Sequence, residues 1–292
     1  MGRADLHTHT KYSGLGVFPM LGFYYPESPT EPDALVGEAE RKGLDLVCIT
    51  DHNTTKGALR VKNRDIVVVG EEITTLDGEV IGLFLSDEIR ARMSAAETID
   101  AIHEQGGIAV VPHPYSVICH SLGDMAFFLD VDGIEIFNAY HRDGYSNRIA
   151  QIESSGSDKA HVGGSDAHYI DMIGNGYTLF DGSSGEDLYR ALKNRRTEAA
   201  GSLTPLIQGI RWSVSTAGYG LRSLLGENGD FDVEKTATKK KFAGVLGGAV
   251  FLLPPVAIGC GLLSDLIVKR MGERKWTDFT KKNIYLNRCN KE

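Results

Sequence analysis

The chain has 292 residues, enough for one barrel-type enzyme domain with an appendage, and 42% of them are hydrophobic, which allows a large core. Its net charge of −8 is uneven: from residue 239 to 292, 11 Lys and Arg stand against 4 Asp and Glu, so this tail carries +7 and the preceding head −15. Such an acidic head excludes strong nonspecific binding of duplex nucleic acid, because it lacks the cations that neutralise phosphates.

The cysteines and the N-terminus point to a reducing compartment. Cys48, Cys119, Cys260 and Cys289 are far apart and form no C-x-x-C pair, so we interpret them as reduced thiols. The chain runs from Met1 almost directly into a strand pattern, without the basic and apolar regions of a secretory signal. We therefore expect a cytoplasmic head.

The head alternates strand-like and helix-like segments. Residues 4–8 have a strand pattern, residues 31–42 that of an amphipathic helix, and residues 44–50 form the nearly continuous apolar run of a buried strand. The next predicted elements are a strand at 66–69, a hairpin at 76–84 that turns at Asp77-Gly78, a helix at 94–105, strands at 108–111 and 133–137, a helix at 145–154, strands at 160–163 and 177–180, a helix at 185–195 and a short strand before Gly201. Repeated βα units of this length predict a parallel sheet.

Metal-binding residue types follow five of these strands. Asp5-Leu6-His7-Thr8-His9 and Gly164-Ser165-Asp166-Ala167-His168 each carry two ligands at i and i+2, which a strand places on one face. Between them lie Thr50-Asp51-His52-Asn53, Gly70-Glu71-Glu72 and Val111-Pro112-His113-Pro114. Because all five follow the C-terminal ends of strands, they favour a barrel over a doubly wound sheet. The alternative, five unrelated helix caps or loops, requires five coincidences.

These five runs resemble the ordered motifs of the PHP family, the polymerase and histidinol phosphatase family, over about residues 1–200. The resemblance implies an α/β fold, a distorted (β/α)7 TIM-like barrel, with two or three Zn, Mn or Fe ions at its C-terminal face and phosphoester hydrolysis as its activity. The implied metal ligands are His7, His9, His52, Glu72, His113, Asp166 and His168. Glu72 rather than Glu71 matches the family's Gly-x-Glu pattern and would be the bridging carboxylate.

The residue types agree with this chemistry. Neutral imidazoles combined with carboxylates suit borderline divalent ions such as Zn and Mn. There are more ligands than one ion can use, so two ions could hold a hydroxide as the nucleophile and neutralise phosphate oxygens. We expect Asp166 or a ligand histidine such as His168 to transfer protons, and Glu72 to act as the bridge.

Two positions depart from the family pattern. Many members carry Asp or His five or six residues after the second motif histidine, where this chain has Gly14 and Leu15. A histidine that often follows the bridging Glu is replaced by Glu79, which is either a further ligand or a solvated hairpin residue. We therefore expect a dinuclear centre, and the third metal stays open.

Other polar residues could bind the substrate or orient a ligand. Lys11, His141 and Arg142 lie just beyond strand ends, where they would either hold a substrate phosphate or be solvated loop residues. Asp51 would either orient a ligand imidazole or cap the segment that follows it. The expected substrate is a small phosphorylated molecule. The alternatives are phosphodiesterase or exonuclease-like activity on short nucleotides, and a non-catalytic metal-binding module that retains the fold.

The tail reads as a separate unit. Residues 242–263 are 22 residues without a charge, long enough to cross a hydrocarbon core of about 30 Å as a helix. Pro254-Pro255 at their centre favours a re-entrant hairpin, and an apolar segment covering a dimer interface is the alternative. The predicted organisation is a phosphoesterase barrel at 1–203, a connector at 204–241, a transmembrane or re-entrant segment at 242–268 and a basic tail at 269–292, with the head held at the inner face of a membrane.

Overall fold

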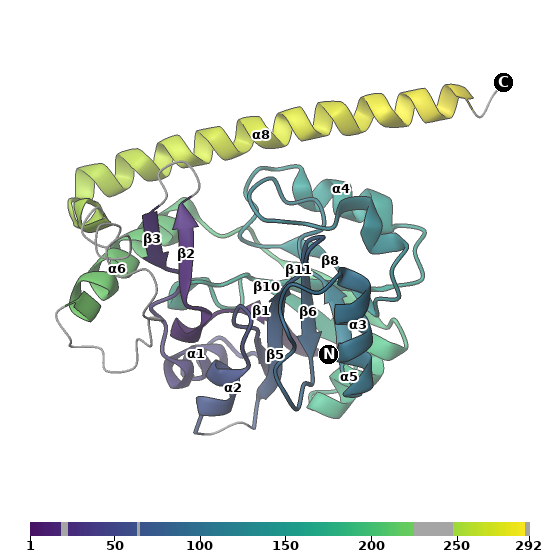
Figure 1. Cartoon of the computed structure of the whole chain (residues 1–292), viewed down its shortest axis with the longest axis horizontal. Helices are drawn as coiled ribbons and strands as arrows, with labels where there is room; N and C mark the ends of the chain where they lie inside the picture. The colour runs from purple at the N-terminus through teal and green to yellow at the C-terminus, as the bar shows by residue number, and fades with distance from the viewer. Residues whose placement is uncertain (19–22, 63–64, 225–247, 290–292) are drawn as a thin grey trace.

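The computed structural model describes residues 1–18, 23–62, 65–224 and 248–289 (Figure 1). Within these residues one sheet has the strand order β11-β10-β1-β4-β5-β6-β7-β8-β9. The strands are β1 Gly2–Thr8, β4 Leu46–Ile49, β5 Val67–Thr74, β6 Glu79–Leu83, β7 Ile108–Val111, β8 Gly133–Asn138, β9 Ala160–Gly164, β10 Gly176–Phe180 and β11 Thr197–Gly201. The sheet is nearly closed, because the Gly163 N–H of β9 donates to Thr178 Oγ1 of β10 at 2.9 Å. The α/β fold and the barrel-like sheet are confirmed.

Strand directions in the sheet are mixed. Strands β1, β4 and β5 run parallel, as do β7, β8 and β9, whereas β6, β10 and β11 are antiparallel to their neighbours. The hairpin predicted at Asp77-Gly78 is confirmed by the pairing of Thr74 with Glu79. A connection this short must reverse the chain, so β6 is antiparallel as the predicted hairpin requires. The prediction of a parallel sheet is wrong at β10 and β11, which run antiparallel to their neighbours.

The described helices of the head that pack against the sheet are α1 Pro32–Arg41, α2 Lys56–Arg60, α3 Ala95–Glu104, α4 Ser146–Ser154 and α5 Gly185–Lys193. One buried cluster joins strand residues such as Cys48 and Val110 to Leu188 of α5. Separate clusters pack α1 and α3 on the other side, through Leu35 and Ile99 respectively. Successive apolar residues of one strand therefore pack on opposite sides of the sheet: Cys48 of β4 belongs to the first cluster, and its neighbours Val47 and Ile49 belong to the cluster of α1.

Several elements were not predicted, among them the short helix α2. A hairpin of β2, Leu15–Phe18, and β3, Phe23–Pro26, follows the first motif, and helix α6, Leu206–Leu224, lies beside it (Figure 1). Helix α6 occupies part of the segment expected to be a connector, whose residues 225–241 lie outside the described residues. The division into domains stays a prediction.

The last described element, α8, Pro254–Cys289, is one helix of 36 residues that crosses above the body of the molecule (Figure 1). It contacts the loops that follow β7 and β8: Asp265 forms an ion pair with Arg142, and Lys275 Nζ donates to the Ser116 carbonyl at 3.0 Å. These loops leave the C-terminal ends of the strands. Helix α8 therefore lies over the face on which the sequence places the metal ligands.

The prediction of a transmembrane or re-entrant segment at 242–268 is wrong, and with it the prediction of membrane association. Among the described residues no helix is both long enough and apolar enough to cross a membrane, and residues 242–247 lie outside them. Pro254-Pro255 begins α8 instead of turning the chain, because the first helical positions need no backbone N–H partner. The charges of Asp265 and Lys269 then follow within the same helix and pair with each other.

Two glycines of α8 provide a test of its docking. A Cβ atom at Gly272 would lie 2.7 Å from Asp143 Oδ1 and 2.9 Å from the Asp143 carbonyl oxygen, whereas one at Gly259 would meet nothing within 4 Å. We expect Gly272→Ala to displace α8 and to speed the hydrogen exchange of its amides. Gly259→Ala should instead stabilise the helix by about 1 kcal/mol. Equal exchange rates in the two variants would contradict the docked position of α8.

Candidate metal centre

Glu72 lies at the centre of a cluster of imidazoles. Its Oε2 atom is 3.2 Å from His7 Nε2, 3.3 Å from His9 Nε2 and 3.3 Å from His52 Nδ1. Its Oε1 atom is 3.2 Å from His113 Nε2. His7 lies near the end of β1, where the register against β4 shifts between Asp5 and Thr8, and His9 follows the strand. Imidazoles from β1 and from the loops after β1, β4 and β7 therefore surround one carboxylate of β5.

Asp166 is the second carboxylate of the cluster. Its Oδ1 atom lies 3.5 Å from His7 Nε2, 3.4 Å from His9 Nε2 and 3.4 Å from His168 Nδ1. Asp166 and His113 have positive φ angles, of 52° and 28°, which residues other than glycine rarely adopt. Such strained backbone persists only where surrounding contacts hold it, and it concentrates at functional sites.

The charges of these groups suit metal coordination. Burial, followed by the nearby His168, lowers the pKa of His9 to about 3, so this imidazole is neutral. His9 Nε2 is buried and makes no hydrogen bond, although the two carboxylates lie close to it. Burial alone would raise the pKa values of Glu72 and Asp166, but His7 and other imidazoles hold both well below their usual range. A neutral lone pair beside ionised carboxylates is the donor set that a divalent cation requires.

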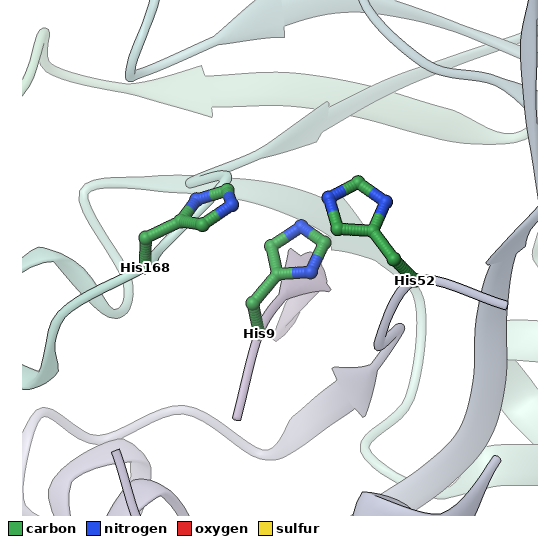
Figure 2. A group of neighbouring side chains, drawn as sticks. All are labelled: His9, His52 and His168. Atoms are coloured by element: carbon green, nitrogen blue, oxygen red, sulfur yellow. The ribbon is translucent and has the colours of Figure 1, made fainter. Parts of the chain in front are cut away.

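Donor atoms that lie within 4.8 Å of one another form several sets of three. They are His7, His9 and Asp166; His7, Glu72 and His113; His52, Glu72 and Glu79; Glu79, His113 and Cys119; and His9, His52 and His168. Figure 2 shows the last set, with the ring of His9 between those of His52 and His168. Nitrogen and oxygen donors in this proportion fit Zn, Mn or Fe better than Ca or Mg, whose sites are built from oxygen.

Hydrogen bonds behind the cluster fix two of the rings. Ser13 Oγ lies 3.0 Å from His9 Nδ1 and itself donates to Asp51 Oδ1 at 2.8 Å. Glu135 Oε1 lies 3.2 Å from His7 Nδ1. Such partners select the tautomer in which Nε2 carries the lone pair. Asp51 therefore does orient a ring of the cluster, through Ser13.

A family model described as PHP-associated matches residues 144–197. Among curated proteins, the uncharacterized protein MJ1587 of Methanocaldococcus jannaschii is 53% identical over 153 residues, which cover 51% of this chain and 88% of that protein. The uncharacterized protein MJ0417 of the same organism is 30% identical over 185 residues, or 61% of this chain and 70% of that protein.

Two solved structures are similar in fold. PsfC from Pseudomonas syringae PB-5123 has a TM-score of 0.53 and 18% identity, over 77% of this chain and 100% of that chain. A two-domain protein from Bacteroides vulgatus ATCC 8482, described as containing a predicted PHP-like metal-dependent phosphoesterase, has a TM-score of 0.50 and 20% identity, over 68% of this chain and 64% of that chain. This chain thus spans less than two thirds of the second structure. The chain belongs to the PHP family.

The seven ligands predicted for this PHP chain come together in one cluster: His7, His9, His52, Glu72, His113, Asp166 and His168. Glu79 lies beside this cluster, and its Oε2 atom is 3.7 Å from His113 Nε2. Glu71 faces the other way, and its Oε2 accepts the Ile89 N–H at 2.8 Å. Whether each side chain of the cluster binds a metal ion stays a prediction.

The three residues predicted to bind substrate in this PHP chain have protein partners. Lys11 Nζ lies 3.0 Å from Glu31 Oε2, and Arg142 pairs with Asp265 of α8. His141 is buried, its Nε2 is 2.6 Å from Ser116 Oγ, and its Nδ1 makes no hydrogen bond.

Three further residues lie at the PHP centre that the sequence did not predict there. Glu135 is a buried carboxylate inside the apolar strand β8, a signal that was present in the sequence. Cys119 joins Glu79 and His113 in one donor set, six residues after that histidine. Glu27 Oε2 lies 3.0 Å from His52 Nε2, and no motif around Glu27 in the sequence predicts this contact.

The raised pKa of Glu71 predicts that the stability of the fold depends on pH. Burial, reinforced by Glu88, raises the pKa of Glu71 from 4.5 to about 7. The folded chain therefore holds this proton more tightly than the unfolded chain, and stability that is complete below pH 4.5 is lost as the pH rises through 7. Between pH 5 and pH 8 we expect the free energy of unfolding, relative to that of Glu71→Gln, to fall by up to about 3 kcal/mol. Urea unfolding of both proteins at the two pH values measures this, and parallel pH profiles would disprove it.

Proposed function

We propose that this chain is a metal-dependent phosphoesterase. The observation that carries the proposal is the buried convergence of His7, His9 and His113 on Glu72, with Asp166 facing the first two of these histidines, at the C-terminal ends of barrel strands. Active sites of barrel enzymes lie at this face. The proposed catalytic unit is the distorted (β/α)7 barrel of residues 1–203, with two or three Zn, Mn or Fe ions.

Bound divalent ions would supply a nucleophilic water near neutral pH and would neutralise phosphate oxygens as their charge grows. Both oxygens of Glu72 face imidazoles, so Glu72 would be the bridging ligand. Asn138 Nδ2 donates to Asp166 Oδ2 at 3.1 Å, which orients this carboxylate and leaves Oδ1 toward the centre. We assign proton transfer to Asp166 together with His168, whose Nδ1 lies 3.4 Å from Asp166 Oδ1.

We propose a small phosphorylated molecule as the substrate class. Helix α8 crosses the face of the centre and is tied to the loops after β7 and β8, which supports a short substrate over a duplex. Of the predicted substrate contacts we favour His141, because Lys11 and Arg142 would have to leave their ion pairs first. A short nucleotide is the second candidate, since its phosphodiester also offers anionic oxygens on a tetrahedral phosphorus to the metal ions.

Metal analysis and hydrolysis assays on the full chain test the proposal. We expect at least two divalent ions per chain by elemental analysis, and turnover of an aryl phosphate monoester or diester in Mn or Zn. The double variant His7→Ala/His9→Ala should lose both. The control is His103→Ala, which removes a histidine bound to Asp132 outside the cluster.

Each result has a distinct meaning. Turnover that disappears in the double variant and persists in His103→Ala establishes the phosphoesterase, and the preferred ester gives its class. Bound metal without turnover of any monoester, diester or short nucleotide favours a metal-binding module. A chain that binds no metal overturns the proposal.

A further inference from the structure

Helix α8 is fixed to the head through one of its faces. Near its start, a Cβ atom at Gly261 would lie 2.7 Å from Ile210 Cγ1 of α6. Farther along, the ring of Trp276 stacks on that of Tyr145, with their centroids 5.4 Å apart. Contacts at two distant points set the rotation of the helix about its own axis. The opposite face of α8 therefore points away from the head (Figure 1).

The outer face of α8 is apolar over the first half of the helix. Large apolar side chains there are 39 to 57% exposed among the described residues: Ile258, Leu262, Leu263, Leu266, Ile267 and Met271. We call this set the outer stripe. It forms two neighbouring rows with i, i+4 spacing, residues 258, 262 and 266 in one and residues 263, 267 and 271 in the other. From residue 254 to 268 the only charged residue is Asp265, which pairs with Arg142 on the inner side.

The outer stripe is large enough for a stable interface. A half-exposed leucine or isoleucine leaves about 85 Å² uncovered, so the stripe together with Leu252 and Leu253, which precede α8, presents roughly 700 Å². The largest apolar patch on a monomer is usually about 300 to 600 Å². Two such surfaces joined face to face would bury roughly 1,400 Å², within the range of about 1,200 to 2,000 Å² that stable, specific interfaces bury.

The composition of the outer stripe favours a second copy of this chain over a different protein. Interfaces with transient partners are about as polar as the rest of a protein surface, whereas interfaces between identical subunits are more apolar. In a twofold interface each surface meets its own copy, so a charged surface would repel itself. The outer stripe carries no charge, and this repulsion does not arise.

The shape of the outer stripe also suits an identical helix. Its two rows leave a groove between them, and a row of a second α8 fits this groove when the two helix axes cross at about 50°. At such an angle the second halves of the two helices diverge. Their charged residues, which begin at Lys269 and Arg270, then stay in water.

We propose that this chain forms a twofold dimer in which the outer stripes of two α8 helices pack against each other. Each metal centre then lies beneath its own α8, and the two heads lie on opposite sides of the paired helices. The ligands of each centre all come from one chain. The inference therefore does not depend on the proposed function.

Sedimentation equilibrium of the full chain over a concentration series tests the interface. We expect the wild type to reach twice the mass of one chain, which is 31.8 kDa. Leu263→Glu brings a like charge into the stripe from both copies without touching the inner face. We expect this variant to raise the dissociation constant of the dimer by about 100-fold or more.

The matched control is Leu59→Glu. Leu59 is also a half-exposed leucine on a helix, with 44% of its surface exposed against 57% for Leu263, and its helix α2 lies on the other side of the head from α8 (Figure 1). We expect this variant to dimerise like the wild type. Leu263→Ala keeps the test valid should Leu263→Glu fail to fold, because it only removes contact area and should weaken the dimer about tenfold.

Mixing variants of opposite charge tests whether the stripe meets its own copy. Leu263→Glu and Leu263→Lys should each sediment as monomers, and an equal mixture of the two should recover dimer, because each glutamate then faces a lysine. A variant that only distorts α8 gives no such recovery. An unrestored mixture would therefore count against the inference.

The other results that overturn the dimer are equally distinct. They are a wild type that stays monomeric at every concentration, a dimer that persists in Leu263→Glu and Leu263→Ala, and assemblies that grow beyond two copies. Loss of the dimer in Leu59→Glu as well would also overturn it, because the contact would then not be specific to α8. Metal content and turnover of the same samples test the phosphoesterase separately.

Discussion

Replacing Glu72 by glutamine is expected to lower turnover by more than about 100-fold and to release metal from the centre. Residues that only orient ligands already cost 10 to 100-fold when changed, and Glu72 faces four imidazoles directly. Glutamine has the same shape but lacks the charge and one of the two acceptor oxygens. Elemental analysis and steady-state hydrolysis of an aryl phosphate measure the two effects.

Glu71→Gln is the matched control for this experiment. Glu71 is the adjacent residue, is equally buried and bonds the Ile89 N–H on the opposite side of β5. We expect this variant to keep the metal content and the turnover of the wild type at pH 7. Equal losses in both variants would mean that damage to β5, rather than loss of the bridge, explains the result.

Asp166→Asn is expected to have an effect of similar size, more than about 100-fold in turnover. The Oδ1 atom of Asp166 faces His7, His9 and His168, and Asn138 already donates to the other oxygen. An amide would place a second donor among these groups and would remove the charge that the imidazoles stabilise. Single-turnover hydrolysis at fixed metal concentration separates lost chemistry from lost metal.

The control here is Asp171→Asn, five residues further along. Asp171 pairs with Arg211 at the surface, at 3.0 Å, and touches none of the clustered histidines. We expect its turnover to stay within about twofold of the wild type, as is usual for surface ion pairs. Unchanged turnover in Asp166→Asn would exclude Asp166 from proton transfer and from metal binding.

The sequence predicted most strands of the head because their signal is local. Apolar runs bounded by glycine and polar residues define β7 at 108–111 and the ends of β8 and β9 to within one residue. The N-terminal Ser94 and Glu97 of α3 form the capping box that such a helix needs. The motif histidines follow from these strands, since parallel strands end at one face.

The tail shows the limit of local patterns. An uncharged stretch has the same composition whether it faces lipid, a partner or the head of its own chain. Contacts across the tertiary structure, such as the ion pair of Asp265 with Arg142 and the hydrogen bond of Lys275 to Ser116, show that α8 packs on the head. Pro254-Pro255 likewise gives no indication in the sequence of whether it turns a chain or begins a helix.

The sequence by itself determined most strands of the head and the five ligand runs that carry the resemblance to the PHP family, because these depend on neighbouring residues and on the two-residue period of a strand. The tertiary structure decided the rest of the centre. Glu27 reaches His52 from a hairpin, Glu135 supports His7 from β8, and α6 and α8 pack around them. Contacts between residues so far apart depend on how the sheet curls and which loops meet, which no local spacing encodes.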